Sequence, residues 1–168
     1  MELSDDDFDR RVQHCEIWRA KLQEDPQLAD RLIWSDESEF RMNGELNKHN
    51  CCYWGYTNQA IQIPISNDRR GVHVLCGISS NGLIGPYFFN GTITGQSYLA
   101  MLQDFAAPHL ADPATYFQQD GAPAHYARTV REWLDDSVPN RWIGRRGPYE
   151  WPARSPDLTP ATFFSGAI

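Results

Sequence analysis

Two aspartates lie at positions where a carboxylate could bind a metal ion or take part in catalysis. Asp36 lies in "IWSDESEF", and Asp120 closes the apolar stretch "TYFQQD" just before Gly121 and Pro123. A strand that breaks in this way leaves its last side chain at a sheet edge, where open α/β folds bind ligands. Carboxylates suit hard divalent cations, which prefer oxygen ligands, and a pair of acids also suits a two-carboxylate hydrolase such as a glycosidase. An aspartate before a glycine is, in addition, a common turn former.

The residues around Asp36 predict a strand. Side chains of a strand alternate between its two faces, so in "RLIWSDESEF" (31–40) Asp36 shares a face with Trp34. We expect Glu37 and Glu39, which alternate outward, to be solvated. Asp36 and Asp120 are therefore the two candidate functional acids.

Helices and strands alternate along the rest of the chain. Ser4 and the acids after it favour a helix start, because a capping residue and first-turn acids stabilise a helix N-terminus. Residues 71–89 predict a hairpin with Asn81-Gly82 as its turn. The remaining predicted elements are a short strand and turn at 49–58, helices at 94–110 and 125–136, strands ending at Asp120 and spanning 141–147, and a proline-rich loop before a last helix. An antiparallel meander followed by this alternation predicts an α/β fold with a mixed sheet flanked by helices.

Composition indicates a single globular domain. The 168 residues are 41% hydrophobic, enough for one sizeable core. The net charge is −7, but the first 40 residues hold 12 of the 22 acids and only five of the 15 bases. Thirteen of those bases are arginine, which suits bidentate phosphate contacts. No apolar run approaches the roughly 20 residues of a membrane span, so we expect an intracellular protein without a membrane partner.

Three motifs, "IWSDESEF", "QQDGAPAHYA" and "EWPARSPDLTP", occur in this order. Together they resemble the catalytic domain of mariner-type transposases, which belong to the DDE/DDD superfamily and have an RNase H-like fold. The resemblance runs from about Leu3 to Phe164. It implies an enzyme that cuts DNA at transposon ends and joins the freed 3′ hydroxyl to a target strand, using two Mg²⁺ or Mn²⁺ ions. It also implies that Asp36 and Asp120 are catalytic acids and metal ligands.

The chain departs from the family pattern at the third acid. That position, two residues after the second proline of "SPDLTP", is Thr162. A hydroxyl supplies no charge to offset two divalent ions, so we expect weak metal binding and little or no activity. Asp157, the nearby acid, is interpreted as a turn or cap residue. After Phe164 the chain reads "SGAI", so we predict a single catalytic domain, 1–168, truncated in its last helix and without the family's N-terminal helix-turn-helix modules.

The sequence therefore predicts a degenerate transposase-type catalytic domain. The alternative is a non-catalytic module that binds DNA or transposase subunits. We expect weak, salt-sensitive phosphate contacts from Arg145 and Arg146. His125, five residues after Asp120, is expected near the metals or as a weak contact to the nucleic acid. For the arginines the alternative is a solvated surface, and for His125 a place at a helix N-terminus. The expected partners are DNA and either a second copy of the chain or full-length transposase subunits, in the nucleus.

Overall fold

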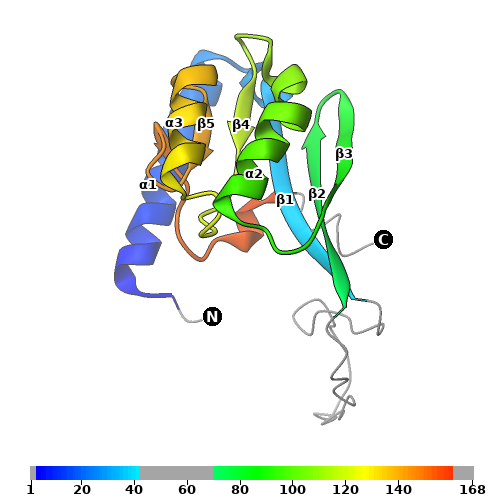
Figure 1. Ribbon diagram of the computed structural model, residues 1–168. Coiled ribbons are helices and arrows are strands. Elements are labelled where there is room, and N and C mark those ends of the chain that lie inside the picture. Colours follow the sequence, from blue (N-terminus) through cyan, green and yellow to red (C-terminus); the bar gives the residue numbers. More distant parts are fainter. Residues whose placement is uncertain (1–2, 42–69, 161–168) are drawn as a thin grey trace, which may run out of the picture.

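The computed structural model describes residues 3–41 and 70–160, and its centre is a six-stranded mixed sheet (Figure 1). The strand order is β3-β2-β1-β4-β5-β6. The strands are β1 (Leu32–Arg41), β2 (Gly71–Ser79), β3 (Gly82–Phe89), β4 (Tyr116–Gln118), β5 (Trp142–Gly144) and β6 (Tyr149–Glu150). β1, β2 and β3 pair antiparallel, whereas β4, β5 and β6 extend the sheet from β1 in parallel. The predicted α/β class, with a meander followed by parallel strands, is confirmed.

Helices cover both faces of this sheet. Within the described residues the α-helices are α1 (Asp5–Glu24), α2 (Gly95–Met101) and α3 (Arg128–Ser137). α2 and α3 pack on one face and α1 on the other (Figure 1). α2 continues into a π turn (Leu102–Ala106) and a 3-10 turn (Ala107–Leu110), and further 3-10 turns lie at Leu28–Arg31 and Pro156–Leu158. None of the helices in the described ranges is long and apolar enough to cross a membrane.

Local chemistry explains where several elements begin. Ser4 caps α1 as predicted: the carboxylate of Asp7 accepts hydrogen bonds from the Ser4 N–H at 2.9 Å and from its hydroxyl at 2.7 Å. The predicted hairpin turn is also present, with Gly82 at a φ of 114° that other residues rarely adopt. α3 begins at Arg128 rather than near residue 125, because residues 123–126 form a turn instead.

Two differences from the predicted elements concern the parallel end of the sheet. The strand predicted at 141–147 is shorter, and the two-residue strand β6 beside it was not predicted. A ladder this short leaves almost no periodic signal in a sequence. The strand and turn predicted at 49–58, and the last helix with Thr162, lie outside the described residues.

β1 separates two apolar cores through the alternation of its side chains. Ile33 belongs to the larger core, which lies between the sheet and helices α2 and α3. Leu32 and Trp34 belong to the smaller core on the opposite face, where Trp18 of α1 packs. Odd-numbered positions of β1 therefore face α2 and α3, and even-numbered positions face α1.

Candidate metal and nucleic-acid site

The predicted acids stand at matching positions on neighbouring strands. β1 and β4 run parallel, and their last paired residues are Trp34 and Gln118. The Ser35 hydroxyl donates to the Gln118 carbonyl at 2.7 Å, which fastens the two strands at this point. Asp36 and Asp120 each come two residues after that pair. Asp120 therefore lies just past the carboxyl end of β4, level in register with Asp36, which lies within β1.

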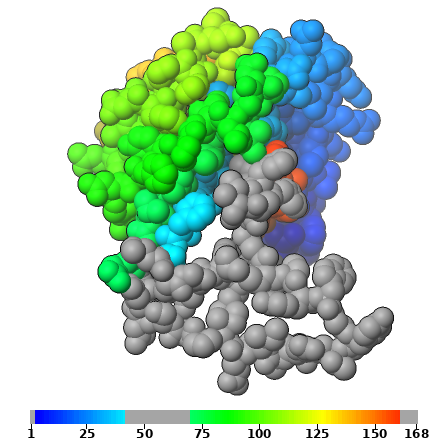
Figure 2. Space-filling model, turned by 90° about the vertical axis from the view of Figure 1, so that its right-hand side faces the viewer, coloured from blue at the N-terminus to red at the C-terminus, as the bar shows by residue number. Residues whose placement is uncertain are grey.

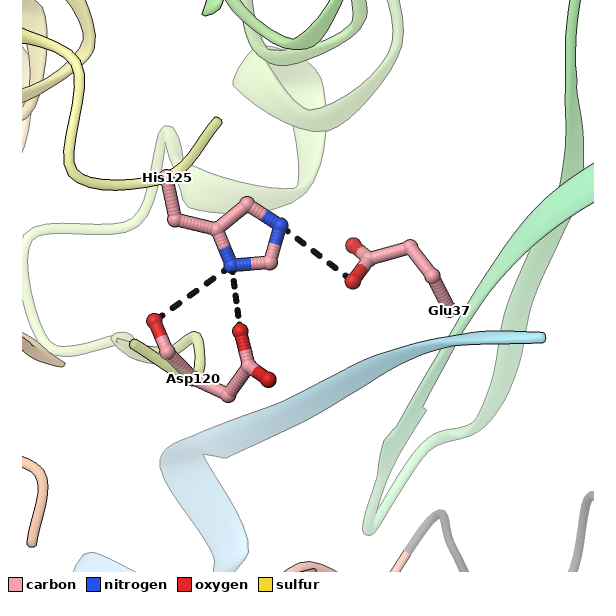
Figure 3. A group of neighbouring side chains, drawn as sticks. All are labelled: Glu37, Asp120 and His125. Atoms are coloured by element: carbon pink, nitrogen blue, oxygen red, sulfur yellow. Dashed lines mark hydrogen bonds and ion pairs between the residues drawn. The ribbon is translucent and has the colours of Figure 1, made fainter. Parts of the chain in front are cut away.

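Asp120 is held by a buried histidine, and a glutamate holds the same histidine from the other side (Figure 3). Nδ1 of His125 lies 2.7 Å from Oδ1 of Asp120 and 3.3 Å from the Asp120 carbonyl oxygen. Nε2 of His125 lies 3.2 Å from Oε2 of Glu37. The imidazole is only 3% exposed and stacks on Tyr98 of α2, with ring centres 4.1 Å apart.

The prediction that Glu37 is solvated was wrong. Its side chain is only 14% exposed, because β1 turns its odd-numbered side chains toward α2 and the segment that carries His125. Glu39, two residues further along the same face, is exposed as predicted. The strand pattern gave the relative orientation of these residues correctly, but it could not indicate which face is covered.

The electrostatics of this group favour a charged imidazole. Burial by itself lowers the pKa of His125, but the charge of Glu37 and hydrogen bonds with Asp120 and Glu37 outweigh it and raise the pKa to about 10. Burial likewise raises the pKa of Asp120, whereas the hydrogen bond and charge of His125 lower it, and the net direction is downward. Both ring nitrogens of His125 therefore carry protons and face carboxylates at neutral pH.

Asp120 is also a turn former. Its Oδ1 accepts the N–H of Ala122 at 2.9 Å as well as the proton of His125, so one oxygen is fixed from two directions. The other oxygen, Oδ2, points away from the imidazole in Figure 3 and has no hydrogen bond from the described residues. The turn and the contact with His125 together orient that oxygen.

The donor atoms around these acids suit a hard divalent cation. Oδ2 of Asp120 and the half-buried carboxylate of Asp36 are oxygen donors, and Oε1 of Glu37 is buried without a hydrogen-bond partner among the described residues. Glu37, Asp120 and His125 also bring one potential ligand atom each within 4.8 Å of one another. Protons on both nitrogens of His125 oppose its use as a ligand, so the oxygens are the better candidates. Asp36 is outside this trio; its Oδ1 accepts the N–H of Glu37 at 2.9 Å.

Asp157 is engaged in a structural ion pair on the α1 side of the sheet. Arg11 of α1 donates to both of its carboxylate oxygens, at 2.9 and 2.5 Å, and also to the Ser155 hydroxyl at 2.8 Å. Hydrogen bonds from Arg11 accordingly lower the pKa of Asp157. Figure 2 shows the red segment before residue 160 against the blue helix α1. Both oxygens of Asp157 are thus used to attach this segment to α1, and Thr162 lies outside the described residues.

The predicted nucleic-acid contacts lie near the same acids. His125 is buried between Glu37 and Asp120 rather than presented to solvent. Arg145 and Arg146 are exposed and follow directly after β5. Their guanidinium carbons lie 4.4 and 5.5 Å from the ring centre of Tyr126. Glu37 and Tyr126 were not predicted; their only signal is that each neighbours a predicted site residue.

Comparison with known proteins gives the family. The sequence matches the DDE superfamily endonuclease family over residues 31–162. The chain belongs to this family. That match begins just before β1 and includes both aspartates as well as position 162. A comparison with curated protein sequences found no match.

Solved structures share the fold of this DDE endonuclease domain. The Mos1 transposase paired-end complex with the left transposon end has a TM-score of 0.72 and 21% identity, covering 99% of this chain and 49% of that chain. The Mos1 mariner paired-end complex with Mn has a TM-score of 0.68 and 25% identity, with 99% and 49% covered. The catalytic domain of Mos1 mariner transposase has a TM-score of 0.67 and 20% identity, with 99% and 71% covered. This chain therefore spans about half the length of the Mos1 chains in the two paired-end complexes, and the RNase H-like fold expected from the resemblance is confirmed.

Proposed function

We propose that this chain is a transposase-type catalytic domain in which Asp36 and Asp120 hold divalent metal ions against a DNA phosphodiester. The observation that carries the proposal is the parallel register of β1 and β4, with both aspartates two residues past the pair Trp34 and Gln118. Neighbouring strands lie about 4.8 Å apart, so carboxylates at matching positions can reach a shared ion.

Mg²⁺ or Mn²⁺ is the cofactor that these oxygen donors fit. When bound, such ions activate the attacking oxygen and stabilise the leaving oxygen of a phosphodiester. The residues of this chain orient one of the acids: Ala122 and His125 hold Oδ1 of Asp120, and Glu37 holds His125. Outer partners of this kind fix the orientation of a metal-ligating carboxylate.

The solved relatives support DNA as the substrate. They include a Mos1 complex with the left transposon end, a Mos1 strand transfer complex, and Mos1 complexes with Mn and with Mg. We extend to this chain DNA cleavage and strand transfer at transposon ends. Its partners would be DNA and a second copy or full-length transposase subunits. The nucleus, where chromosomal DNA is found, is the corresponding location.

Thr162 weakens the proposed metal site. At the third acid position of the family pattern it offers a neutral hydroxyl, and Asp157 cannot replace the missing charge while Arg11 occupies both of its oxygens. We therefore infer that this domain is degenerate, with weak metal binding and little activity of its own. A non-catalytic module that binds DNA or transposase subunits is the alternative, since such a role does not need the third acid.

Nicking of supercoiled plasmid DNA in Mg²⁺ or Mn²⁺ tests the proposal. We expect little nicking by the natural chain and a gain of at least about tenfold when T162D restores the third charge. In the T162D background, D36N and D120N should each abolish the gain, whereas D157N should keep it. Nicking that persists in D36N and D120N would refute the assigned acids, and nicking without any metal ion would point to a two-carboxylate hydrolase instead.

A further inference from the structure

Three arginines surround one tyrosine ring beside the proposed metal site. The guanidinium carbons of Arg131, Arg145 and Arg146 lie 4.7, 4.4 and 5.5 Å from the ring centre of Tyr126. Nε of Arg131 also donates to the Tyr126 carbonyl oxygen at 3.3 Å. We call these four residues the arginine cluster. Cation–π attraction of this kind holds guanidinium groups over an aromatic face and fixes their orientation.

Within the part of the chain that the structure describes, no carboxylate neutralises the positive charge of the arginine cluster. Within residues 3–41 and 70–160, none of its three guanidinium groups forms an ion pair with a carboxylate. By contrast, Arg11 pairs with Asp157, and Arg128, one turn before Arg131 on α3, pairs with Glu132. Three like charges around one ring repel each other, so an anion bound between them stabilises the arrangement.

The backbone places Arg145 of the cluster level with the two aspartates. β4 and β5 run parallel with Gln118 opposite Ile143, so Asp120 and Arg145 each come two residues after that pair. A Cβ atom on Gly121 would lie only 3.7 Å from Cβ of Arg145, which shows how closely this arginine covers the residue after Asp120. The register of three adjacent strands thus places Asp36, which lies within β1, level with Asp120 and Arg145, which lie just past the ends of β4 and β5.

Arg146 occupies a backbone conformation that its side chain does not favour. Its φ is 57°, in the left-handed region preferred by glycine and asparagine. The turn between β5 and β6 closes with a hydrogen bond from the Gly147 N–H to the Gly144 carbonyl oxygen at 3.1 Å. Glycine would serve this turn with less strain, so the turn does not account for an arginine here, whereas an anion site does.

We propose that the arginine cluster is a subsite for one backbone phosphate of a nucleic-acid strand, next to the phosphodiester at Asp36 and Asp120. Guanidinium groups match phosphate oxygens in a two-point geometry through their N–H donors. Arg145 and Arg146 are exposed and donate no side-chain hydrogen bond within residues 3–41 and 70–160, whereas Nε of Arg131 is already used by the Tyr126 carbonyl oxygen. The subsite holds the strand in register without a metal ion. That the subsite lies next to a strand being cut rests on the proposed function. That the subsite binds a nucleic-acid strand does not.

Binding of fluorescently labelled duplex DNA to the full chain in EDTA, over a series of salt concentrations, tests the subsite. R145Q/R146Q should weaken binding by about tenfold at 0.1 M salt, because charge-assisted contacts to phosphate are lost. It should reduce the slope of log affinity against log salt by about 0.9, the value for one phosphate, rather than about 1.8 for two separate contacts. R128Q on the exposed face of α3 is the matched control, and we expect it to bind within about twofold of the natural chain.

Y126L separates a built subsite from a diffuse basic surface. It leaves the charge unchanged but removes the ring that holds the guanidinium groups, so it should weaken DNA binding by about threefold or more. Circular dichroism checks that each variant is folded; if Y126L is not, the comparison of R145Q/R146Q with R128Q still decides. Equal DNA binding by R145Q/R146Q and R128Q, or a slope change of about 1.8, would overturn the proposal.

The same assay distinguishes a nucleic-acid strand from an acidic protein surface. Poly-glutamate of the same charge as the DNA should compete poorly. If it competes equally and this competition requires the arginine cluster, the ligand is an acidic protein and the proposal fails. Failure of the proposed function gives a different result: DNA binding then depends on the cluster in EDTA, while D36N and D120N leave metal-dependent nicking in the T162D background unchanged.

Discussion

Replacing Glu37 with glutamine tests the buried carboxylate–imidazole–carboxylate arrangement. E37Q keeps the shape of the side chain but removes the charge that lies 3.2 Å from Nε2 of His125. Burial lowers the pKa of His125, yet the charge of Glu37 is the strongest of the opposing causes, and the pKa rises from 6.5 to about 10. Between these two pH values the folded chain therefore binds a proton that the unfolded chain releases.

The size and sign of the effect follow from this difference in proton binding. A pKa raised from 6.5 to about 10 corresponds to about 4 kcal/mol of unfolding free energy at pH 7. His125 can lose its proton once Glu37 is neutral, which limits the cost of E37Q to roughly 2 to 3 kcal/mol. Since the folded pKa is the higher one, the contribution is complete below about pH 6.5 and is lost as the pH rises through about 10.

Urea unfolding in metal-free buffer at about pH 6, 8 and 10 measures the cost of E37Q in unfolding free energy, with fluorescence of the six tryptophans as the signal. The difference in unfolding free energy between the natural chain and E37Q should be largest at the lowest pH and close to zero at the highest. E39Q is the matched control, because Glu39 lies on the same strand face but is exposed, and among the described residues its ion pair is with the partly exposed Arg41. Its effect should stay within about 0.5 kcal/mol. A difference in unfolding free energy that stays constant across this pH range would refute the assigned role of Glu37. The same difference in E39Q would also refute it.

Three further substitutions test the surrounding structure. G95A should lower the unfolding free energy measured in urea by about 1 to 3 kcal/mol, because a Cβ at position 95 would lie 2.5 Å from Cβ of Ala127. An unchanged urea midpoint would contradict the close packing of α2 on the residues before α3. D157N should cost at most about 1 kcal/mol, since its pair with Arg11 is half-exposed, and Mn²⁺ affinity should not change; a loss of that affinity would make Asp157 a ligand. D120N should weaken the dependence of the melting temperature on pH in the acid range. Burial raises the pKa of Asp120, but the hydrogen bond and charge of the His125 imidazolium outweigh it and lower this pKa. The carboxylate therefore stabilises the fold above the ordinary carboxyl pKa, and this stabilisation is lost as the pH falls through the lowered pKa. Identical acid profiles would exclude this linkage.

The sequence predicted those elements whose signals are local. The helix start at Ser4 and the hairpin turn at Gly82 follow from capping and backbone preference, and the structure has both. The motifs of Asp36 and Asp120 predicted the fold through family resemblance. Alternation in β1 also predicted that Asp36 shares the face of Trp34.

Features that depend on packing between distant segments could not be predicted in this way. Alternation does not indicate which face of β1 is covered, so Glu37 was assigned to solvent although the segment of His125 covers it. The contact of Arg145 with Tyr126 depends on how the turn after β5 meets the segment after Asp120. Hydrophobic periodicity carries no information on such side-chain contacts across an edge.

The most direct test of the central claim is the affinity of the chain for Mn²⁺, followed by electron paramagnetic resonance of the free ion. D36N and D120N remove one proposed ligand each, and D157N removes an acid that is bound to Arg11. Asp36 and Asp120 should each account for at least about a tenfold change in affinity, while D157N matches the natural chain. Unchanged Mn²⁺ binding in either D36N or D120N would contradict the claim that these two aspartates share a metal site.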